Sequence, residues 1–336
     1  MKLFMRDSQA IIETIKAETV IIDQYIREDL SSLKPEVDGL LYRVLEYGLL
    51  SGGKRIRPLL LVLSARMCEN RREDVYRLGC AFEYLHAATL FHDDIIDNSD
   101  FRRGKESVFK KFGTVAAILA GDFLHALAME IVGKFCGDRG LAVFCGATKG
   151  MVDGEFLQLR NADRHNISEL DYHSTIMGKT GLLIAAACEI GAIYGGGNNS
   201  EIKALREYGV NLGCAFQIVD DLLDYLGDAQ TTGKVVGNDF SEGKMTLPLI
   251  LAIRGAGEKD RDQMVALLES GGMGDGSFKE ICGLITKYGG FKKAGSRASD
   301  AVEKGCAALM IFKNKDIAPE RQILEELARY IIIRKK

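Results

Sequence analysis

The chain has 336 residues, 47% of them hydrophobic, and a mean hydropathy near zero, which supplies enough apolar sequence for a substantial buried core. Its 44 basic and 47 acidic residues leave a formal charge of -3, which excludes a general attraction for nucleic acid or anionic membranes and leaves electrostatic function to local clusters. We expect a cytoplasmic protein without an integral membrane segment. The N-terminus lacks an apolar signal region, and the longest apolar run, residues 181–195, is too short to span a bilayer.

Helical periodicity is present from the first segment of the chain to the last. Apolar residues recur at i, i+3, i+4 and i+7 in residues 8–30, 36–51, 116–135, 199–226 and 318–334. Alternating β-branched runs bounded by turns are missing, and the glycine-rich breaks are too short to be domain linkers. We therefore predict an all-α fold with a single domain over residues 1–336.

Two similar acidic motifs each follow a long apolar helical run, near the C-terminal end of a helix. "FHDDIIDN" at 91–98 recurs as "IVDDLLDY" at 218–225. In each copy the first and third aspartates are four residues apart, so they share a helix face from which the middle aspartate is rotated by about 100°. Asp93 and Asp97 form the first pair, and Asp220 and Asp224 form the second.

The acidic motifs require something cationic nearby. Carboxylates near a helix C-terminus repel one another and the helix dipole. A solvated acidic patch would explain one motif, but two copies embedded in apolar sequence favour a bound counter-ion. Oxygen ligands without nearby Cys or His suit Mg²⁺, which binds through one or two carboxylates and through substrate phosphates. We predict Mg²⁺ as cofactor, with Asp93, Asp97, Asp220 and Asp224 as its ligands.

Clusters of basic residues complement the acidic motifs. "SGGKRIRP" places Lys54 and Arg57 at the start of a helix, where backbone N–H groups and cationic side chains suit a phosphate. Arg102 and Arg103 directly follow the first acidic motif. Separate acidic and basic clusters around an apolar interior favour a protein that binds more than one diphosphate, one of them attached to a hydrocarbon.

Three further lysines belong to polar segments of the second half. Lys179 interrupts an apolar helix in "IMGKTGLL"; a phosphate-binding P-loop is rejected there, because the first glycine of its motif and the preceding strand are absent. Lys234 and Lys244 lie in the connection 227–244, which is long and polar enough to be a functional lid. Taken singly, each lysine would be interpreted as a solvated surface charge.

At this point the sequence resembles the all-trans isoprenyl diphosphate (polyprenyl) synthases, over nearly its whole length. The resemblance rests on seven blocks in order: "GGKRIRP" (52–58), "HAATLFHDDIIDNSDFRRG" (86–104), "GDFLHALA" (121–128), "GEFLQL" (154–159), "GKTGLLIAAACEIGA" (178–192), "AFQIVDDLLDY" (215–225) and "VGNDFSEGKMTLPLI" (236–250). It implies a bundle of long, mostly antiparallel helices around a central apolar cavity, and a homodimer.

The resemblance also implies a reaction and its residues. Isopentenyl diphosphate would condense with an allylic diphosphate after pyrophosphate leaves, and Asp93, Asp97, Arg102, Lys179, Asp220 and Lys234 would be catalytic. The residues implied for isopentenyl diphosphate are Lys54, Arg57, His86 and Arg103. Those implied for the allylic diphosphate are Arg102, Lys179, Thr180, Gln217, Lys234 and Lys244. Without this context, His86 would be interpreted as a core histidine.

Product length is predicted from the residues just before the first acidic motif. Ala88 and Thr89 are small, whereas shorter-chain members of the family carry aromatic residues there. We therefore expect a product of C30 to C50, comparable to that of an octaprenyl diphosphate synthase. Phe144 is the candidate floor of the cavity, with Phe123 and Leu127 as rivals, and any of the three can instead be an ordinary core residue.

Three alternatives remain at this stage. A geranylgeranyl or farnesyl diphosphate synthase would share every motif. A class I terpene cyclase would share the first acidic motif, but the second one and the "GGKRIRP" cluster argue against it. A non-catalytic subunit of a heteromeric synthase would lack the ligands that are intact here.

Overall fold

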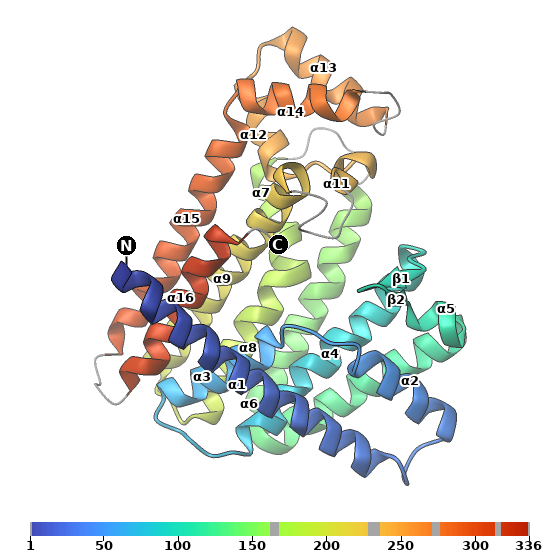
Figure 1. The fold of residues 1–336 in the computed structure, drawn as a ribbon, viewed down its shortest axis with the longest axis vertical. Coiled ribbons are helices and arrows are strands. Elements are labelled where there is room, and N and C mark those ends of the chain that lie inside the picture. Colours follow the sequence, from blue (N-terminus) through green and yellow to red (C-terminus); the bar gives the residue numbers. More distant parts are fainter. Residues whose placement is uncertain (1, 162–167, 228–235, 271–275, 313–316, 335–336) are drawn as a thin grey trace. The chain divides into compact units, whose positions relative to one another are not determined.

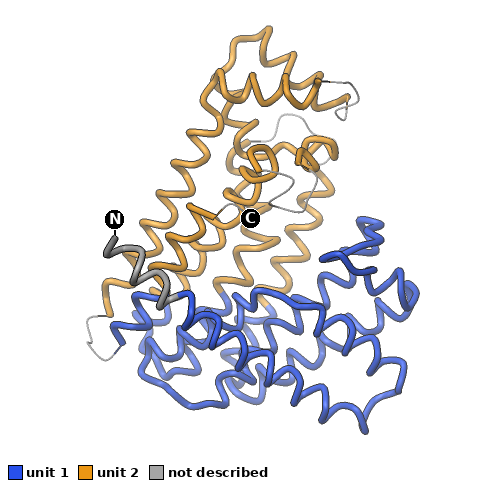
Figure 2. Tube along the Cα trace, viewed as in Figure 1, with its two compact units in different colours: residues 1–145, 186–203, 314–323 blue, residues 146–185, 204–313, 324–336 orange. Residues whose placement is uncertain are grey.

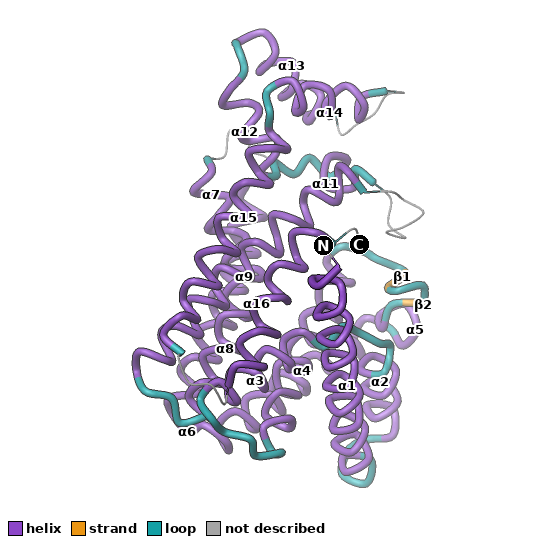
Figure 3. The backbone as a smooth tube through the Cα atoms, turned by 60° about the vertical axis from the view of Figure 1, so that its left-hand side comes forward, coloured by secondary structure: helices purple, strands orange, loops and turns teal. Residues whose placement is uncertain are grey.

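The computed structural model describes residues 2–161, 168–227, 236–270, 276–312 and 317–334, and for residues 2–11 the backbone alone. Nearly all of this part of the chain is helical, which confirms the predicted all-α class (Figure 3). Figure 1 follows the elements along the chain. They are α1 (Lys2–Leu33), α2 (Gly39–Leu49), α3 (Ile56–Met67), α4 (Val75–Ile96), β1 (Phe101–Arg102), β2 (Lys105–Glu106), α5 (Val108–Phe112), α6 (Thr114–Asn161), α7 (Glu169–Ile176), the π-helix η1 (Met177–Gly181), α8 (Leu182–Tyr194), α9 (Asn199–Leu226), α11 (Asn238–Ser241), α12 (Leu247–Gly255), α13 (Glu258–Glu269), α14 (Ser277–Lys287), α15 (Gly290–Ala308), the short 3₁₀-helix η2 (Leu309–Ile311) and α16 (Ala318–Ile333).

The chain forms two compact units, shown in different colours in Figure 2. Unit 1 comprises Met1–Cys145, Ala186–Lys203 and Asn314–Ile323. Unit 2 comprises Gly146–Ala185, Ala204–Lys313 and Leu324–Lys336. Each unit holds one of the two acidic motifs. A single domain, with both motifs facing one cavity, stays a prediction.

Helix α4 carries the first acidic motif and packs against α1, α2, α3 and α5 within unit 1. Most of its residues are buried, because its sequence is apolar around the whole circumference rather than on one stripe. Gly79 permits the close contact with α3, since a Cβ there would lie 3.3 Å from the Cα of Pro58. The helix ends at the motif, with Asp97 as its C-cap. The predicted position of the motif at a helix C-terminus is therefore confirmed.

A short β-hairpin directly after α4 was missed by the sequence analysis. β1 and β2 are antiparallel, with Phe101 opposite Glu106 and Arg102 opposite Lys105. Both turn residues have positive φ, 53° at Arg103 and 76° at Gly104, as a two-residue turn of type I′ requires. Strands of two residues are too short to produce an alternating pattern in the sequence. The turn fixes where Arg102 and Arg103 leave the backbone.

Close glycine contacts hold the second basic segment in unit 2. A Cβ on Gly178 of η1 would lie 2.7 Å from the Cα of Gly154 on α6. A Cβ on Gly213 of α9 would lie 2.7 Å from the Cα of Gly181, also in η1. Any side chain at these positions would overlap backbone atoms, so glycine is required. The π-helix η1, which carries Lys179, is thereby packed against α6 and α9.

Two helical stretches are long and apolar enough to cross a membrane when judged by length and composition alone. They are Thr114–Asn161 and Glu169–Tyr194, whose most apolar windows are 39% and 67% buried within the structure. Core helices of globular proteins meet the same criterion. The first stretch is α6, whose two halves meet at Gly137 with a φ of 57°.

Candidate active site

The three aspartates of the first motif have different surroundings in unit 1. Asp97 is exposed and Asp93 is half-buried, whereas Asp94 is only 2% exposed. Asp94 accepts a hydrogen bond from Nε of Arg102 at 2.7 Å. Burial raises the pKa of Asp94, although the Arg102 guanidinium acts in the opposite direction. The middle aspartate therefore serves as an internal partner that orients Arg102, and the outer two remain as candidate ligands.

The predicted isopentenyl diphosphate residues include a group of closely spaced cations in unit 1. His86 and Arg103 line one cavity together with Arg102 and Asp94. Burial lowers the pKa of Arg57, and neighbouring Arg103 lowers it further. The buried Nε of Arg57 makes no hydrogen bond among the described residues. Lys54 is exposed on the loop that precedes α3.

His86 lies one helical turn after Glu83 and faces this cavity. Burial lowers its pKa well below 6.5, and Arg57, Arg103, Arg102 and Arg55 lower it further. The imidazole is therefore neutral at pH 7 and can donate one hydrogen bond to a ligand. An anion held by the arginines would raise the pKa of His86 again, because it would offset their charge.

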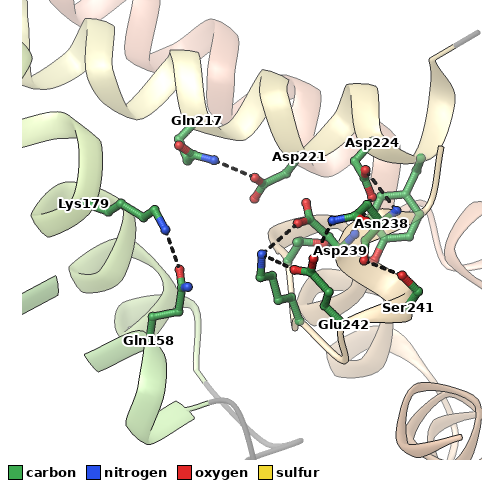
Figure 4. Close-up of polar contacts among 12 residues, drawn as sticks. Gln158, Lys179, Gln217, Asp221, Asp224, Asn238, Asp239, Ser241 and Glu242 are labelled. Carbon is green, nitrogen blue, oxygen red and sulfur yellow. Dashed lines mark hydrogen bonds and ion pairs between the residues drawn. The ribbon is translucent and has the colours of Figure 1, made fainter. Parts of the chain in front are cut away.

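The second motif, in unit 2, repeats the division of roles seen in the first. Asp221 is buried and accepts a hydrogen bond from Tyr172 Oη at 2.6 Å. It accepts a second one from Gln217 Nε2 at 3.0 Å (Figure 4). Burial raises the pKa of Asp221 to about 7, against these two donors. Asp220 is half-buried and lies 3.2 Å from Nη2 of Arg334, near the C-terminus of the chain. Again the middle aspartate has an internal role.

Asp224 organises the described end of the predicted lid. Its carboxylate accepts the backbone N–H groups of Asn238 at 3.2 Å and Asp239 at 3.1 Å, at the start of α11 (Figure 4). Helix N-termini favour such a negative partner. Asp224 therefore supports a neighbouring segment, which limits the directions from which it can bind a metal ion. Lys234 lies outside the described residues, as do residues 228–235 of the predicted lid.

Lys244 is held by two acidic residues that the sequence analysis did not select. Its Nζ lies 2.5 Å from Glu242 and 3.5 Å from Asp239. Burial alone would lower the pKa of Lys244, but these two carboxylates raise it above its usual value. The block "GNDFSEGK" contained both acids, and their spacing from the lysine was the available signal. Lys244 is thus a fixed cation near the second motif.

Lys179 and Thr180 are neighbours in η1, and Thr180 contacts Gln217 of α9; that all three bind the allylic diphosphate stays a prediction. Thr180 Oγ1 donates to Gln217 Oε1 at 3.1 Å, and Gln217 in turn donates to Asp221. Lys179 Nζ lies 2.9 Å from Glu155 of α6. It also lies 3.5 Å from Gln158 Oε1 of the same helix (Figure 4). Glu155 and Gln158 belong to the block "GEFLQL" but were not selected as site residues.

The predicted chain-length residues all lie in unit 1. Ala88 is 3% exposed and Thr89 is half-buried. By helix geometry Thr89 lies about 40° around α4 from Asp93, whereas Ala88 lies about 140° away. Phe144 is fully buried and packs edge-to-face on Phe82, with ring centroids 5.4 Å apart. Phe82 shares the α4 face of Asp93, roughly 16 Å below it at 1.5 Å per residue. Phe144 as cavity floor stays a prediction.

A comparison with known protein families decides the identity. The pattern described as polyprenyl synthetase matches residues 38–285, which include every predicted site residue from Lys54 to Lys244. The chain belongs to the polyprenyl synthetase family. These enzymes are prenyltransferases.

Relatives of this synthetase family cover almost the whole chain. The octaprenyl diphosphate synthase of Escherichia coli is 35% identical over 313 residues, which is 93% of this chain and 94% of the relative. The short chain isoprenyl diphosphate synthase of Methanothermobacter thermautotrophicus is 36% identical over 329 residues, 96% of this chain and 98% of the relative.

Solved structures of family members are also similar to this chain over almost its whole length. The geranylgeranyl pyrophosphate synthetase of Pyrococcus horikoshii has a TM-score of 0.87 at 32% identity, covering 98% of this chain and 99% of that one. The decaprenyl diphosphate synthase of Rhodobacter capsulatus has a TM-score of 0.86 at 33% identity, with the same coverage. Enzymes named for short and for long products are thus equally similar to this polyprenyl synthetase, so similarity alone does not assign product length.

Proposed function

We propose that this prenyltransferase condenses isopentenyl diphosphate with an allylic diphosphate in the trans, head-to-tail sense and makes a C30–C50 polyprenyl diphosphate. The half-buried guanidinium of Arg57 carries the proposal, because its buried Nε makes no hydrogen bond among the described residues and Arg103 lies close to it, which favours an anionic ligand. Lys179 and Lys244 offer a second set of cations in unit 2 for the allylic diphosphate.

The donor atoms fit Mg²⁺ as the cofactor. Within the part of the chain that the structure describes, no group of three or more His, Cys, Asp or Glu residues is placed to hold a metal ion. Mg²⁺ does not need such a cage, since it usually binds through one or two carboxylates and takes its other ligands from water and phosphate. We propose Asp93, Asp97 and Asp220 as its ligands, with Asp224 in support. Bound Mg²⁺ would stabilise pyrophosphate as a leaving group.

The side chains of this protein then have separate tasks. Arg102 and Lys179 would hold the allylic diphosphate and stabilise the charge that grows as its C–O bond breaks. Arg57, Arg103 and neutral His86 would hold isopentenyl diphosphate, whose double bond attacks the allylic cation. Loss of a proton, for which the departing pyrophosphate is the acceptor, completes a product one isopentenyl unit longer. The apolar core around α4 would keep water from the cation.

A long product is proposed because the α4 positions before Asp93 carry small side chains. A shorter-chain enzyme is the second candidate, since the geranylgeranyl diphosphate synthase of Methanosarcina mazei is 33% identical over 332 residues. Incubation with isopentenyl diphosphate, farnesyl diphosphate and Mg²⁺, followed by chromatography of the extracted alcohols, separates the two. A C20 end product would refute the long-chain assignment. Cyclised hydrocarbons would indicate a terpene cyclase. The absence of product with every primer would indicate a non-catalytic subunit.

We also propose that the protein is a homodimer in the cytoplasm. The first turns of α6 expose large apolar side chains, with Val115 70% and Leu119 60% exposed. A second copy of the chain would cover this face. Light scattering should give twice the monomer mass, and Leu119→Lys should lower it. A monomer that pellets with lipid vesicles would show instead that α6 contacts a membrane, and cell fractionation tests the location.

A further inference from the structure

A buried carboxylate lies among the arginines of unit 1, and the proposed reaction does not use it. Glu83 is on α4, 5% exposed, and lines the same cavity as His86 and Arg103. Its Oε1 accepts a hydrogen bond from Nη1 of Arg55 at 2.5 Å. A buried carboxylate is costly unless it is paired, so the position of this acid requires an explanation.

Arg55 is the direct partner of Glu83, and protein groups occupy all of its nitrogens. Nε donates to Asp23 at 2.8 Å, Nη1 to Glu83, and Nη2 to the carbonyl of Leu49 at 2.8 Å. Its backbone adopts a left-handed conformation, with φ 50°, immediately before α3. Arg55 therefore acts as a brace for residues 52–57 rather than as a ligand-binding arginine.

Glu83 also acts on the two arginines that have fewer protein partners. Burial lowers the pKa of both Arg57 and Arg103, and Glu83 is the carboxylate that raises each of them again. Around the position that a Cβ of Gly53 would occupy, Nη1 of Arg55, Nη1 of Arg103 and Oε1 of Glu83 all lie within 3.4 Å. Glu83 thus acts on three guanidinium groups, of which Arg55 is also paired with Asp23, so that a net positive charge remains beside neutral His86.

We propose that Glu83 is a positioning residue of the isopentenyl diphosphate site. It fixes Arg55, and through it the loop that carries Lys54 and Arg57, and it keeps Arg57 and Arg103 close together before any diphosphate arrives. The inference rests on the proposed function only for the identity of the diphosphate.

Glu83→Gln tests this, because it keeps the shape of the side chain and removes the charge. The expected result is a KM for isopentenyl diphosphate about ten- to hundredfold higher, by analogy with the loss found when the hydrogen-bonding partners of metal ligands are removed. The KM for farnesyl diphosphate and kcat should change by less than about threefold in the same assay. Glu83→Asp keeps the charge on a shorter side chain and should recover part of the lost affinity. If Glu83→Gln does not fold, the KM values of Glu83→Asp test the proposal by themselves.

Glu18→Gln is the matched control. Glu18 is also a buried acid of unit 1, 8% exposed, and pairs with Arg66 at 2.7 Å and with Tyr76. Glu18→Gln and Glu83→Gln should both lower the melting temperature. Glu18→Gln should leave the KM values for both substrates unchanged. Equal changes in the two KM values for the Glu83 variants, or an unchanged KM for isopentenyl diphosphate, would overturn the proposal and make Glu83 a purely structural acid.

Calorimetry with isopentenyl diphosphate alone, without metal ion or primer, separates this inference from the proposed function. An inactive wild type that binds the diphosphate would refute the proposed reaction, while weaker binding to Glu83→Gln would still support the role of Glu83. Equal binding by the two proteins would refute that role even if the wild type were active.

Discussion

Substitution of Gly154 tests whether the backbone contacts of η1 position Lys179. A Cβ at Gly154 would lie 2.7 Å from the backbone N of Lys179 and 2.9 Å from both Cα and C of Gly178. These are backbone atoms, so a change of rotamer cannot relieve the overlap. In Gly154→Ala, α6 and η1 must move apart by several tenths of an ångström.

The expected change in the free energy of unfolding of Gly154→Ala follows from two opposing effects. Overpacking of a filled interior costs about 1–3 kcal/mol. Alanine in place of glycine within a helix returns up to about 1 kcal/mol. We therefore expect Gly154→Ala to lower the free energy of unfolding by about 1–2 kcal/mol, equivalent to a melting temperature a few °C lower. The shift of η1 should also displace Lys179 from Glu155 and lower kcat/KM for the allylic primer about tenfold or more.

Gly283→Ala is the matched control. Gly283 is an exposed residue of α14, and no atom outside its own helix backbone lies within 4 Å of the position of its Cβ. Alanine there should raise the free energy of unfolding by up to about 1 kcal/mol and leave kinetics unchanged. Thermal unfolding and steady-state kinetics with both substrates measure the effects. Equal melting temperatures and equal kcat/KM values for the two variants would refute the reasoning.

Three shorter predictions address other parts of the site. The pKa of His86 is lower in the folded protein than in the unfolded chain, so the unfolded state binds the extra proton and stability should fall as the pH drops below about 6.5. His86→Gln should therefore flatten this part of the pH–stability curve. An unchanged slope would contradict the prediction. Arg334→Gln removes the cation beside Asp220 and should tighten Mg²⁺ binding in calorimetry, whereas weaker binding would show that Arg334 helps to build the site. Thr89→Phe should shorten the product more than Ala88→Tyr does, because Thr89 lies closer to the α4 face of Asp93, and alcohol chromatography would show the opposite order if the tail follows Ala88.

Local patterns in the sequence predicted what depends on neighbours along the helix. The helical class, the ends of α4 and α9 at the acidic motifs, and the separation of Asp94 from Asp93 and Asp97 all follow from the period of 3.6 residues. The grouping of Thr180 with Gln217 followed from the family resemblance rather than from spacing.

The missed features depend on partners far apart in the chain. Glu83 looks like one acid in an apolar helix until Arg55, 28 residues earlier, is placed beside it. Asp224 looked like a metal ligand, and its hydrogen bonds to the start of α11 follow only from the path of the chain beyond the helix. The exact tightness of the contact at Gly154 is likewise a property of two helices packed together, which composition does not reveal.

The middle aspartates show how the two motifs differ despite the same spacing. Asp94 is paired with a cation, Arg102, whereas the described donors to Asp221 are neutral, Tyr172 and Gln217. Burial raises the pKa of Asp221 to about 7, so the second motif carries less negative charge near neutral pH than its three carboxyl groups suggest. A cation bound at Asp220 would favour the ionised form of Asp221 and release its proton. The second motif can therefore gain negative charge as a cation arrives, whereas in the first motif Arg102 is already the partner of the middle carboxylate.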